Sequence, residues 1–130
     1  MNGTVAAECI FCTESLADDR PVVVRTQYFV AVKDKYPVNV GHTLVVPCRH
    51  VGRLRDLTVE EFVDLRKILT HVQDTLARQN AEGFNIGVNE GEVAGQTVFH
   101  LHVHVIPRYA GDVASPRGGI RNLKPALVEY

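Results

Sequence analysis

The stretch His100-Leu101-His102-Val103-His104-Val105-Ile106 decides how this sequence is interpreted. Histidines and apolar residues alternate along it, and alternate residues of a β-strand point to opposite faces of a sheet. Leu101, Val103 and Val105 are therefore expected to face the core. The three histidines are expected on the opposite face, about 6.6 Å apart along the strand. Because lysine, threonine or glutamate would serve equally well on a solvated face, three histidines in register indicate a chemical use for imidazole.

Two uses of the imidazoles can be compared. A catalytic zinc ion bound by all three is disfavoured, because the Cα atoms of His100 and His104 would lie about 13 Å apart in an extended strand, whereas Zn–N bonds are only about 2.0–2.1 Å long. Nucleophilic attack on phosphorus fits better, since neutral imidazole both attacks and leaves well. Such attack by one ring nitrogen requires the other to hold its proton, usually through a carbonyl or carboxylate partner.

Segments with strand character lie on both sides of one predicted helix. The helix begins at a capping box formed by Thr58 and Glu61, and Gly83 ends it. Its apolar positions recur at steps of three and four residues: Phe62, Leu65, Leu69, Val72 and Leu76. The expected strands are 21–25 and 28–33 as a hairpin, 42–46 stopped by Pro47, 84–89, and 97–106 closed by Pro107.

This order of elements predicts the α+β class, with an antiparallel sheet and one main helix packed on a face. We expect a single domain over residues 1–130, with its core at about 8–112 and an irregular C-terminal tail at 113–130. The 130 residues are 45% hydrophobic and 22% charged, and the net charge is −1. These values argue against a whole-chain attraction to nucleic acid or to a membrane surface. Three cysteines without an export signal or a long apolar run favour a cytoplasmic protein with thiols or metal ligands.

The histidine stretch, followed by Pro107-Arg108, resembles the signature of the histidine triad (HIT) family. Gly95-Gln96-Thr97 precedes it as in that family, residues 41–47 resemble the family's central strand, and residues 85–92 resemble its nucleotide-binding strand and loop. The resemblance covers roughly residues 8–112. It implies the HIT fold, a homodimer, and an enzyme that acts on purine nucleotides.

The resemblance also implies roles for two histidines. His102 would attack the α-phosphorus and form a covalent nucleotidyl-histidine, from which water releases a nucleoside monophosphate. His104 would contact the phosphate and assist the leaving group. The transferase branch of the superfamily carries glutamine at this third position, so His104 favours hydrolysis. The alternative function is a non-catalytic nucleotide-sensing protein that binds partners through the same pocket.

Further residues match nucleotide-binding positions of the family. Asp34, eight residues before His42, would bind the ribose hydroxyls. His42 itself is either a structural histidine or a substrate ligand. For the remaining five candidates, the alternative to nucleotide binding is an ordinary role in a loop or in the core. Asn89, Gln96 and Thr97 would bind phosphate oxygens, and Ile10 and Phe11 would sandwich the base.

Cys9 and Cys12 have the spacing with which two thiolates bind one zinc ion. A redox pair would normally open a helix in a βαβ unit, which is not expected here, and two unconnected buried thiols are the other alternative. By resemblance to bacterial-type HIT proteins, Cys9, Cys12, His50 and His100 would form a closed Cys₂His₂ zinc site that is structural and not catalytic. Cys48 is a rival ligand because it lies two residues from His50.

The substrate is expected to be a dinucleoside polyphosphate or a nucleoside phosphoramidate. The stretch from Pro107 to Asp112 resembles the dinucleoside polyphosphate hydrolase branch, whereas the branch that prefers phosphoramidates usually continues with glycines. The segment 117–121 contains two arginines, which would either contact a longer phosphate chain or form a solvated basic tail.

Overall fold

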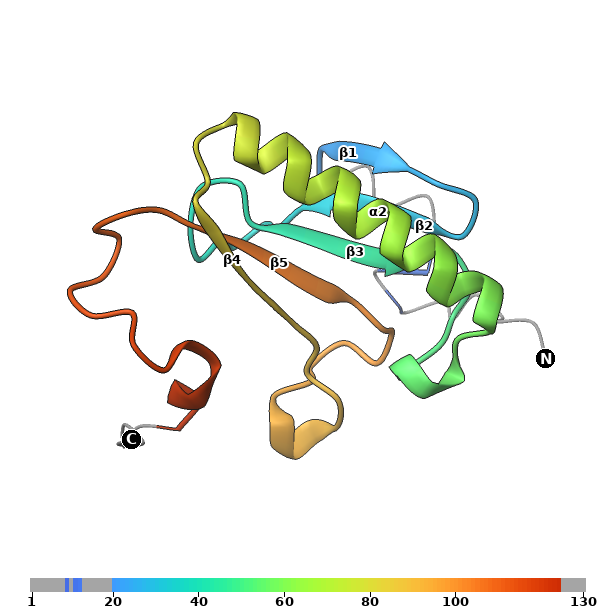
Figure 1. The fold of residues 1–130 in the computed structure, drawn as a ribbon. Coiled ribbons are helices and arrows are strands. Elements are labelled where there is room, and N and C mark those ends of the chain that lie inside the picture. The colour runs from blue at the N-terminus through green and yellow to red at the C-terminus, as the bar shows by residue number, and fades with distance from the viewer. Residues whose placement is uncertain (1–8, 10, 13–19, 125–130) are drawn as a thin grey trace.

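The computed structural model describes residue 9, residues 11–12 and residues 20–124. Within these residues, five strands form one antiparallel sheet in the order β1-β2-β3-β5-β4, and one long helix, α2 (Val59–Arg78), lies across one face of it (Figure 1). The predicted α+β architecture is therefore confirmed. The strands are β1 (Val22–Arg25), β2 (Phe29–Lys33), β3 (Thr43–Pro47), β4 (Gly83–Gly87) and β5 (Val103–Arg108), with short 3₁₀ turns η1 (Leu54–Asp56), η2 (Glu92–Ala94) and η3 (Gly119–Asn122).

The start of α2 follows the predicted capping box. The Thr58 hydroxyl accepts from the Glu61 N–H at 3.1 Å, and the Glu61 carboxylate accepts from the Thr58 N–H at 2.8 Å. Phe62 was expected on the buried face but is 45% exposed. Glu61 takes the inward position of the first turn because its carboxylate also binds Arg49 at 2.8 Å. The buried stripe then continues through Leu65, Ile68, Val72 and Leu76, with Leu69 half-buried beside it.

The end of α2 differs from the prediction in the residue that stops it. Asn80, with a φ of 76°, adopts the left-handed conformation expected of Gly83. The Ala81 N–H then bonds the Leu76 carbonyl at 3.0 Å, and the Asn80 N–H bonds the Ala77 carbonyl at 3.1 Å. This is a Schellman motif, which asparagine tolerates better than other non-glycine residues. Gly83 instead begins β4.

The histidine strand is shorter at its start and longer at its end than predicted. Residues 97–102 are not in the sheet, because the backbone of Leu101 bonds Val51 in the loop after β3 (2.6 Å). Pro107 does not close the strand, which continues to Arg108. The Pro107 carbonyl accepts from the Asn39 side chain at 3.0 Å. The side of Pro107 that lacks an N–H donor therefore faces a loop and not a neighbouring strand, so proline is tolerated in β5.

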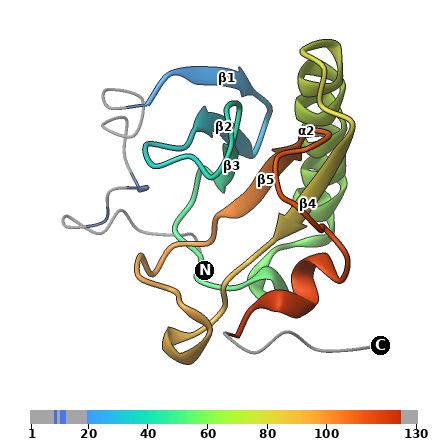
Figure 2. The same cartoon turned by 90° about the vertical axis from the view of Figure 1, so that its left-hand side faces the viewer.

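The two faces of the sheet differ in what covers them, because α2 lies along one of them (Figure 2). The face under α2 holds the main core, to which Leu101, Val103 and Val105 contribute as predicted. The opposite face, called here the open face, carries a smaller apolar group that we call the Phe11 cluster: Phe11, Val30, Val32, Leu44 and Val46. None of the helices in the described part of the chain is long and apolar enough to cross a membrane.

Candidate active site and metal centre

His102 lies immediately before β5, and its side chain is only 9% exposed. Its Nδ1 atom is 2.8 Å from the backbone carbonyl oxygen of His100. A carbonyl only accepts hydrogen bonds, so Nδ1 carries the proton and Nε2 keeps its lone pair. The ring also contacts Phe11, at 4.9 Å between centroids, and His104, at 5.2 Å. His102 therefore has the tautomer that a nucleophilic imidazole needs.

His104, on β5, has a second histidine as its partner. The Nδ1 atom of His104 lies 2.9 Å from Nε2 of His42, while Nδ1 of His42 accepts from the Val38 N–H at 3.0 Å. The neutral His42 ring must then carry its proton on Nε2 and donate it to His104. His104 in turn keeps its own proton on Nε2. Burial, with the nearby histidines, lowers the pKa of His104 to about 4, so this ring is neutral at pH 7.

Asp34 lies beside this histidine pair, with a side chain that is 13% exposed. Its Oδ2 atom is 3.2 Å from Nε2 of His42 and 4.0 Å from Nδ1 of His104, and its Oδ1 atom accepts from the Tyr36 N–H at 2.8 Å. Burial lowers the pKa of His42, and the charge of Asp34 opposes this shift. The three side chains are close enough to share a metal ion. However, the 2.9 Å between the two ring nitrogens is already explained by a hydrogen bond.

Four further side chains converge where the N-terminal segment meets the loop after β3. The candidate ligand atoms of Cys9, Cys12, His50 and His100 all lie within 4.8 Å of one another. Cys12 Sγ is 2.6 Å from His50 Nδ1 and 3.2 Å from His100 Nδ1, and the two Nδ1 atoms are 3.2 Å apart. Tetrahedral zinc with these ligands requires separations of about 3.3–3.8 Å. The donor set suits zinc, and the two separations of 3.2 Å are near this requirement, whereas the 2.6 Å between Cys12 Sγ and His50 Nδ1 is shorter. Cys48 is exposed and lies outside the group.

The hydrogen bond made by Nε2 of His100 sets the tautomer that a metal ligand needs. Nε2 lies 2.9 Å from the Pro47 carbonyl, so it carries the proton and Nδ1 presents its lone pair to the cluster. The ring is completely buried, and burial lowers its pKa to about 4. Burial raises the pKa of the Cys9 thiol to about 11, and a dication at this place would supply the charge that a thiolate needs. His100 and His104 thus belong to separate clusters, so the triad does not converge on one ion.

Known proteins resemble this chain over most of its length. The model of the HIT domain family matches residues 16–111. The chain belongs to the HIT domain family. It is 34% identical to a zinc-bound histidine triad family protein from Mycobacterium smegmatis, with a TM-score of 0.72 over 83% of this chain and 80% of that one.

Several relatives of this HIT protein have names that state a reaction. The asymmetrical bis(5′-nucleosyl)-tetraphosphatase of Schizosaccharomyces pombe is 44% identical over 92 residues, which are 70% of this chain and 50% of the relative. The AP-4-A phosphorylase of Mycobacterium tuberculosis is 41% identical over 103 residues, which are 75% of this chain and 51% of the relative. This HIT chain therefore spans about half the length of these two enzymes.

The residues expected to bind nucleotide in this HIT domain have different surroundings in the structure. Asn89 lines a cavity beside His104. The amide of Gln96 bonds the Gly91 N–H at 2.9 Å and the Gly52 carbonyl at 3.3 Å, so in this structure it holds a loop in place. Thr97 is exposed. Phe11 is buried against His102, and Ile10 lies outside the described residues.

Arg20 is a candidate site residue that the sequence did not indicate. Its side chain is 7% exposed, and its guanidinium carbon lies 5.4 Å from the centre of the Phe11 ring. Within the described part of the chain its Nε atom has no hydrogen-bond partner. In the sequence it precedes a strand like any surface arginine, and only the fold places it against the ring that contacts His102.

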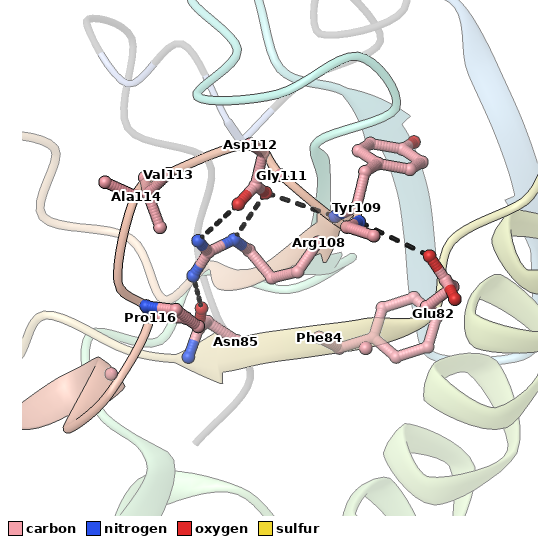
Figure 3. Close-up of a pocket in the computed structure, with 13 residues that line it drawn as sticks. Glu82, Phe84, Asn85, Arg108, Tyr109, Gly111, Asp112, Val113, Ala114 and Pro116 are labelled. Atoms are coloured by element: carbon pink, nitrogen blue, oxygen red, sulfur yellow. Dashed lines mark hydrogen bonds and ion pairs between the residues drawn. The ribbon is translucent and has the colours of Figure 1, made fainter.

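Two cavities open near the strands β4 and β5. The first, of about 280 Å³, includes His42 and His104 in its lining. The second, of about 540 Å³, lies at the other end of these strands and is lined by residues such as Glu82, Arg108 and Tyr109 (Figure 3). There the guanidinium of Arg108 bonds both oxygens of Asp112 at 2.8 Å and lowers the pKa of that carboxyl. Arg108 therefore holds the start of the C-terminal tail.

Proposed function

We propose that this HIT protein hydrolyses dinucleoside polyphosphates through a covalent nucleotidyl intermediate on Nε2 of His102. The observation that carries the proposal is the 2.8 Å contact between Nδ1 of His102 and the His100 carbonyl, which leaves Nε2 available for attack. The names of the two relatives support a dinucleoside tetraphosphate as substrate. The product released after water attack is a nucleoside monophosphate.

The reaction divides into two displacements at one phosphorus. In the first, the Nε2 lone pair of His102 forms a bond to the α-phosphorus while the P–O bond to the rest of the chain breaks, and the polyphosphate leaves with that electron pair. The His100 carbonyl stabilises the imidazolium through Nδ1–H. In the second, water attacks phosphorus, the P–N bond breaks, and the water proton passes to the solvent.

The protonation state of His104 determines which leaving groups the site can assist. Its pKa of about 4 keeps the ring neutral, so at pH 7 it donates a hydrogen bond from Nε2 but gives up no proton. A polyphosphate can leave as an anion with such help, whereas the ammonia of a phosphoramidate requires a proton. This difference favours dinucleoside polyphosphates over nucleoside phosphoramidates as substrates of this chain.

The Cys₂His₂ cluster would hold a structural zinc ion through Cys9, Cys12, His50 and His100. An ion with four protein ligands has no open position for water or phosphate, so its contribution would be to tie the N-terminal segment to the loop after β3. Phe11 lies between the two cysteines in sequence, and its ring packs against His102. The cluster would therefore position one wall of the site.

The remaining roles are part of the same proposal. Asp34 would bind the ribose hydroxyls, Phe11 and Ile10 the base, and Asn89, Gln96 and Thr97 the phosphate oxygens. Gln96 would do so only after exchanging one of its loop contacts. The protein would act on purine nucleotides as a cytoplasmic homodimer, and the outer edge of β4 offers backbone groups for pairing.

The test is a product analysis with purified protein and diadenosine tetraphosphate. Attack at the α-phosphorus should give AMP and ATP, and in ¹⁸O-water the label should appear in AMP. Release of ADP with phosphate as the acceptor would indicate a phosphorylase. Tight binding without turnover would favour the alternative of a nucleotide-sensing protein.

A further inference from the structure

The cavity of about 280 Å³ beside His104 has a mainly apolar lining. This volume is near the lower end of the range for small-molecule pockets, about 300–1,000 Å³, and suits one flat ring system. Three polar residues of the proposed active site belong to its lining: His42, Asn89 and His104. Its aliphatic side chains come from the loop before β3, from β5 and from the tail: Val38, Ile106, Ile120 and Leu123. Ile86 of β4 and Val88 just after it pack against the main core on the α2 face.

The outer wall of this cavity belongs to the C-terminal tail. Ile120 and Leu123 are 54% and 80% exposed, so their apolar surface lies open to water next to the active site. The Ile120 Cδ1 atom lies 3.9 Å from the point that a Cβ on Gly87 would occupy, which places the tail directly against β4 (Figure 2). The Arg108–Asp112 ion pair holds the start of the tail. The wall is thus positioned by specific contacts.

The strand register places the cavity on one side of the histidines and the Phe11 cluster on the other. His104 is paired with Leu44 on β3, which belongs to the Phe11 cluster, and with Gly87 on β4, which lines the cavity. Adjacent strands lie about 4.8 Å apart, so each apolar region begins one strand away from His104. A dinucleoside polyphosphate has an aromatic base at each end and a phosphate chain between them.

We infer that the cavity beside His104 binds the nucleoside of the leaving group, with Ile120 and Leu123 as specificity-determining residues. This inference rests on the proposed function, in which the first base binds beside Phe11 and the α-phosphorus lies at His102. The polyphosphate then passes His104 and Asn89. The second base packs with one side against Gly87 of β4 and Ile106 of β5, and with the other side against the tail. Burial of exposed apolar side chains by the base stabilises the complex.

The test compares two substrates that differ only in the second nucleoside: diadenosine tetraphosphate and adenosine 5′-tetraphosphate. Ile120→Ala and Leu123→Ala should each raise the KM for diadenosine tetraphosphate about tenfold, a typical effect of removing aliphatic carbons from an apolar pocket. Their kcat and their KM for adenosine 5′-tetraphosphate should stay near the parent values. Val63→Ala, on the opposite side of the molecule and 53% exposed, is the matched control and should change neither KM.

Binding to His102→Ala separates the inference from the proposed function, because it needs no turnover. Ile120→Ala in that background should weaken diadenosine tetraphosphate about tenfold and leave AMP binding unchanged. If neither substrate is hydrolysed by the parent but this selective weakening is found, the hydrolase proposal fails and the subsite stands. Equal effects on both ligands, no effect, or an effect only on AMP would overturn the subsite. Leu123→Ala, at the more exposed position, repeats the test if Ile120→Ala folds poorly.

Discussion

At the scale of single residues, the chemistry of the site depends on which nitrogen of each imidazole carries the proton. For His102 this is Nδ1, which is bound to the His100 carbonyl. We expect His102→Ala to lower kcat by about 10³-fold or more while nucleotide binding is kept, because the binding contacts come from other residues. Steady-state kinetics and calorimetry measure the two effects. His71→Ala, an exposed histidine on α2, is the control, and a near-normal rate at saturating substrate in His102→Ala would exclude the nucleophile role.

His42 acts through His104 and is a positioning residue. His42→Leu removes the Nε2–H donor at 2.9 Å from His104, so His104 can turn or change tautomer. We expect kcat to fall about 10²-fold with little change in KM, and His42→Gln, whose amide can donate from a similar place, to recover most of the rate. The two pH–rate profiles are the second readout. Equal losses in the leucine and glutamine variants, with identical profiles, would indicate that His42 only fills space.

At the scale of elements, the sequence was informative wherever one local interaction decides the structure. The Thr58–Glu61 capping box and the alternation of Leu101, Val103 and Val105 are such cases, and both are confirmed. The errors arose where tertiary contacts compete with local patterns. Arg49 turns Glu61 inward in place of Phe62, and Val51 keeps Leu101 out of the sheet.

The Cys₂His₂ cluster connects three elements, and its removal should act on stability more than on chemistry. We expect the parent to contain about one zinc per chain and the double variant Cys9→Ser, Cys12→Ser to contain almost none. Its melting temperature should fall because the ligands are far apart in sequence and the tie restrains the unfolded chain. Turnover per folded molecule should persist. Metal analysis, calorimetry and single-turnover rates provide the measurements.

Cys48→Ser is the matched control, since this thiol is exposed and lies outside the cluster. It should leave both zinc content and melting temperature unchanged. A double variant that melts normally and retains zinc would show that Cys9 and Cys12 are not ligands. A well-folded double variant without any turnover would instead support a catalytic metal.

At the scale of the whole molecule, the site contains contacts between residues that could not be predicted from their spacing in the sequence. The triad motif and the Cys-x-x-Cys pair indicated chemistry. His42 lies beside His104 because β3 pairs with β5, and Arg20 over Phe11 is a tertiary contact between residues outside the strands. The cavity wall at Ile120 and Leu123 was likewise unpredictable, because the tail carries no periodic pattern. Its position depends on long-range contacts to Asp112 and β4.

Acid stability is a property of the whole molecule that His104 should influence. The pKa of His104 is about 4 when folded, against an ordinary value of 6.5, so the unfolded chain binds the extra proton between these pH values. The contribution of His104 to the free energy of unfolding is therefore fully present above pH 6.5. It is lost as the pH falls towards 4, and the loss is about 2–3 kcal/mol. Denaturant unfolding at pH 7 and pH 4 should show a smaller loss in His104→Gln than in the parent. Equal losses would contradict the assigned burial effect.

The central claim is that His102 forms a covalent intermediate, and the stereochemical course at phosphorus tests it most directly. A dinucleoside polyphosphate made chiral at the attacked phosphorus with sulfur and an oxygen isotope is hydrolysed, and the configuration of the released monophosphate is determined. Each in-line displacement inverts phosphorus. Attack by His102 followed by attack by water therefore predicts overall retention. Inversion would mean that water attacks directly, and it would contradict the covalent mechanism.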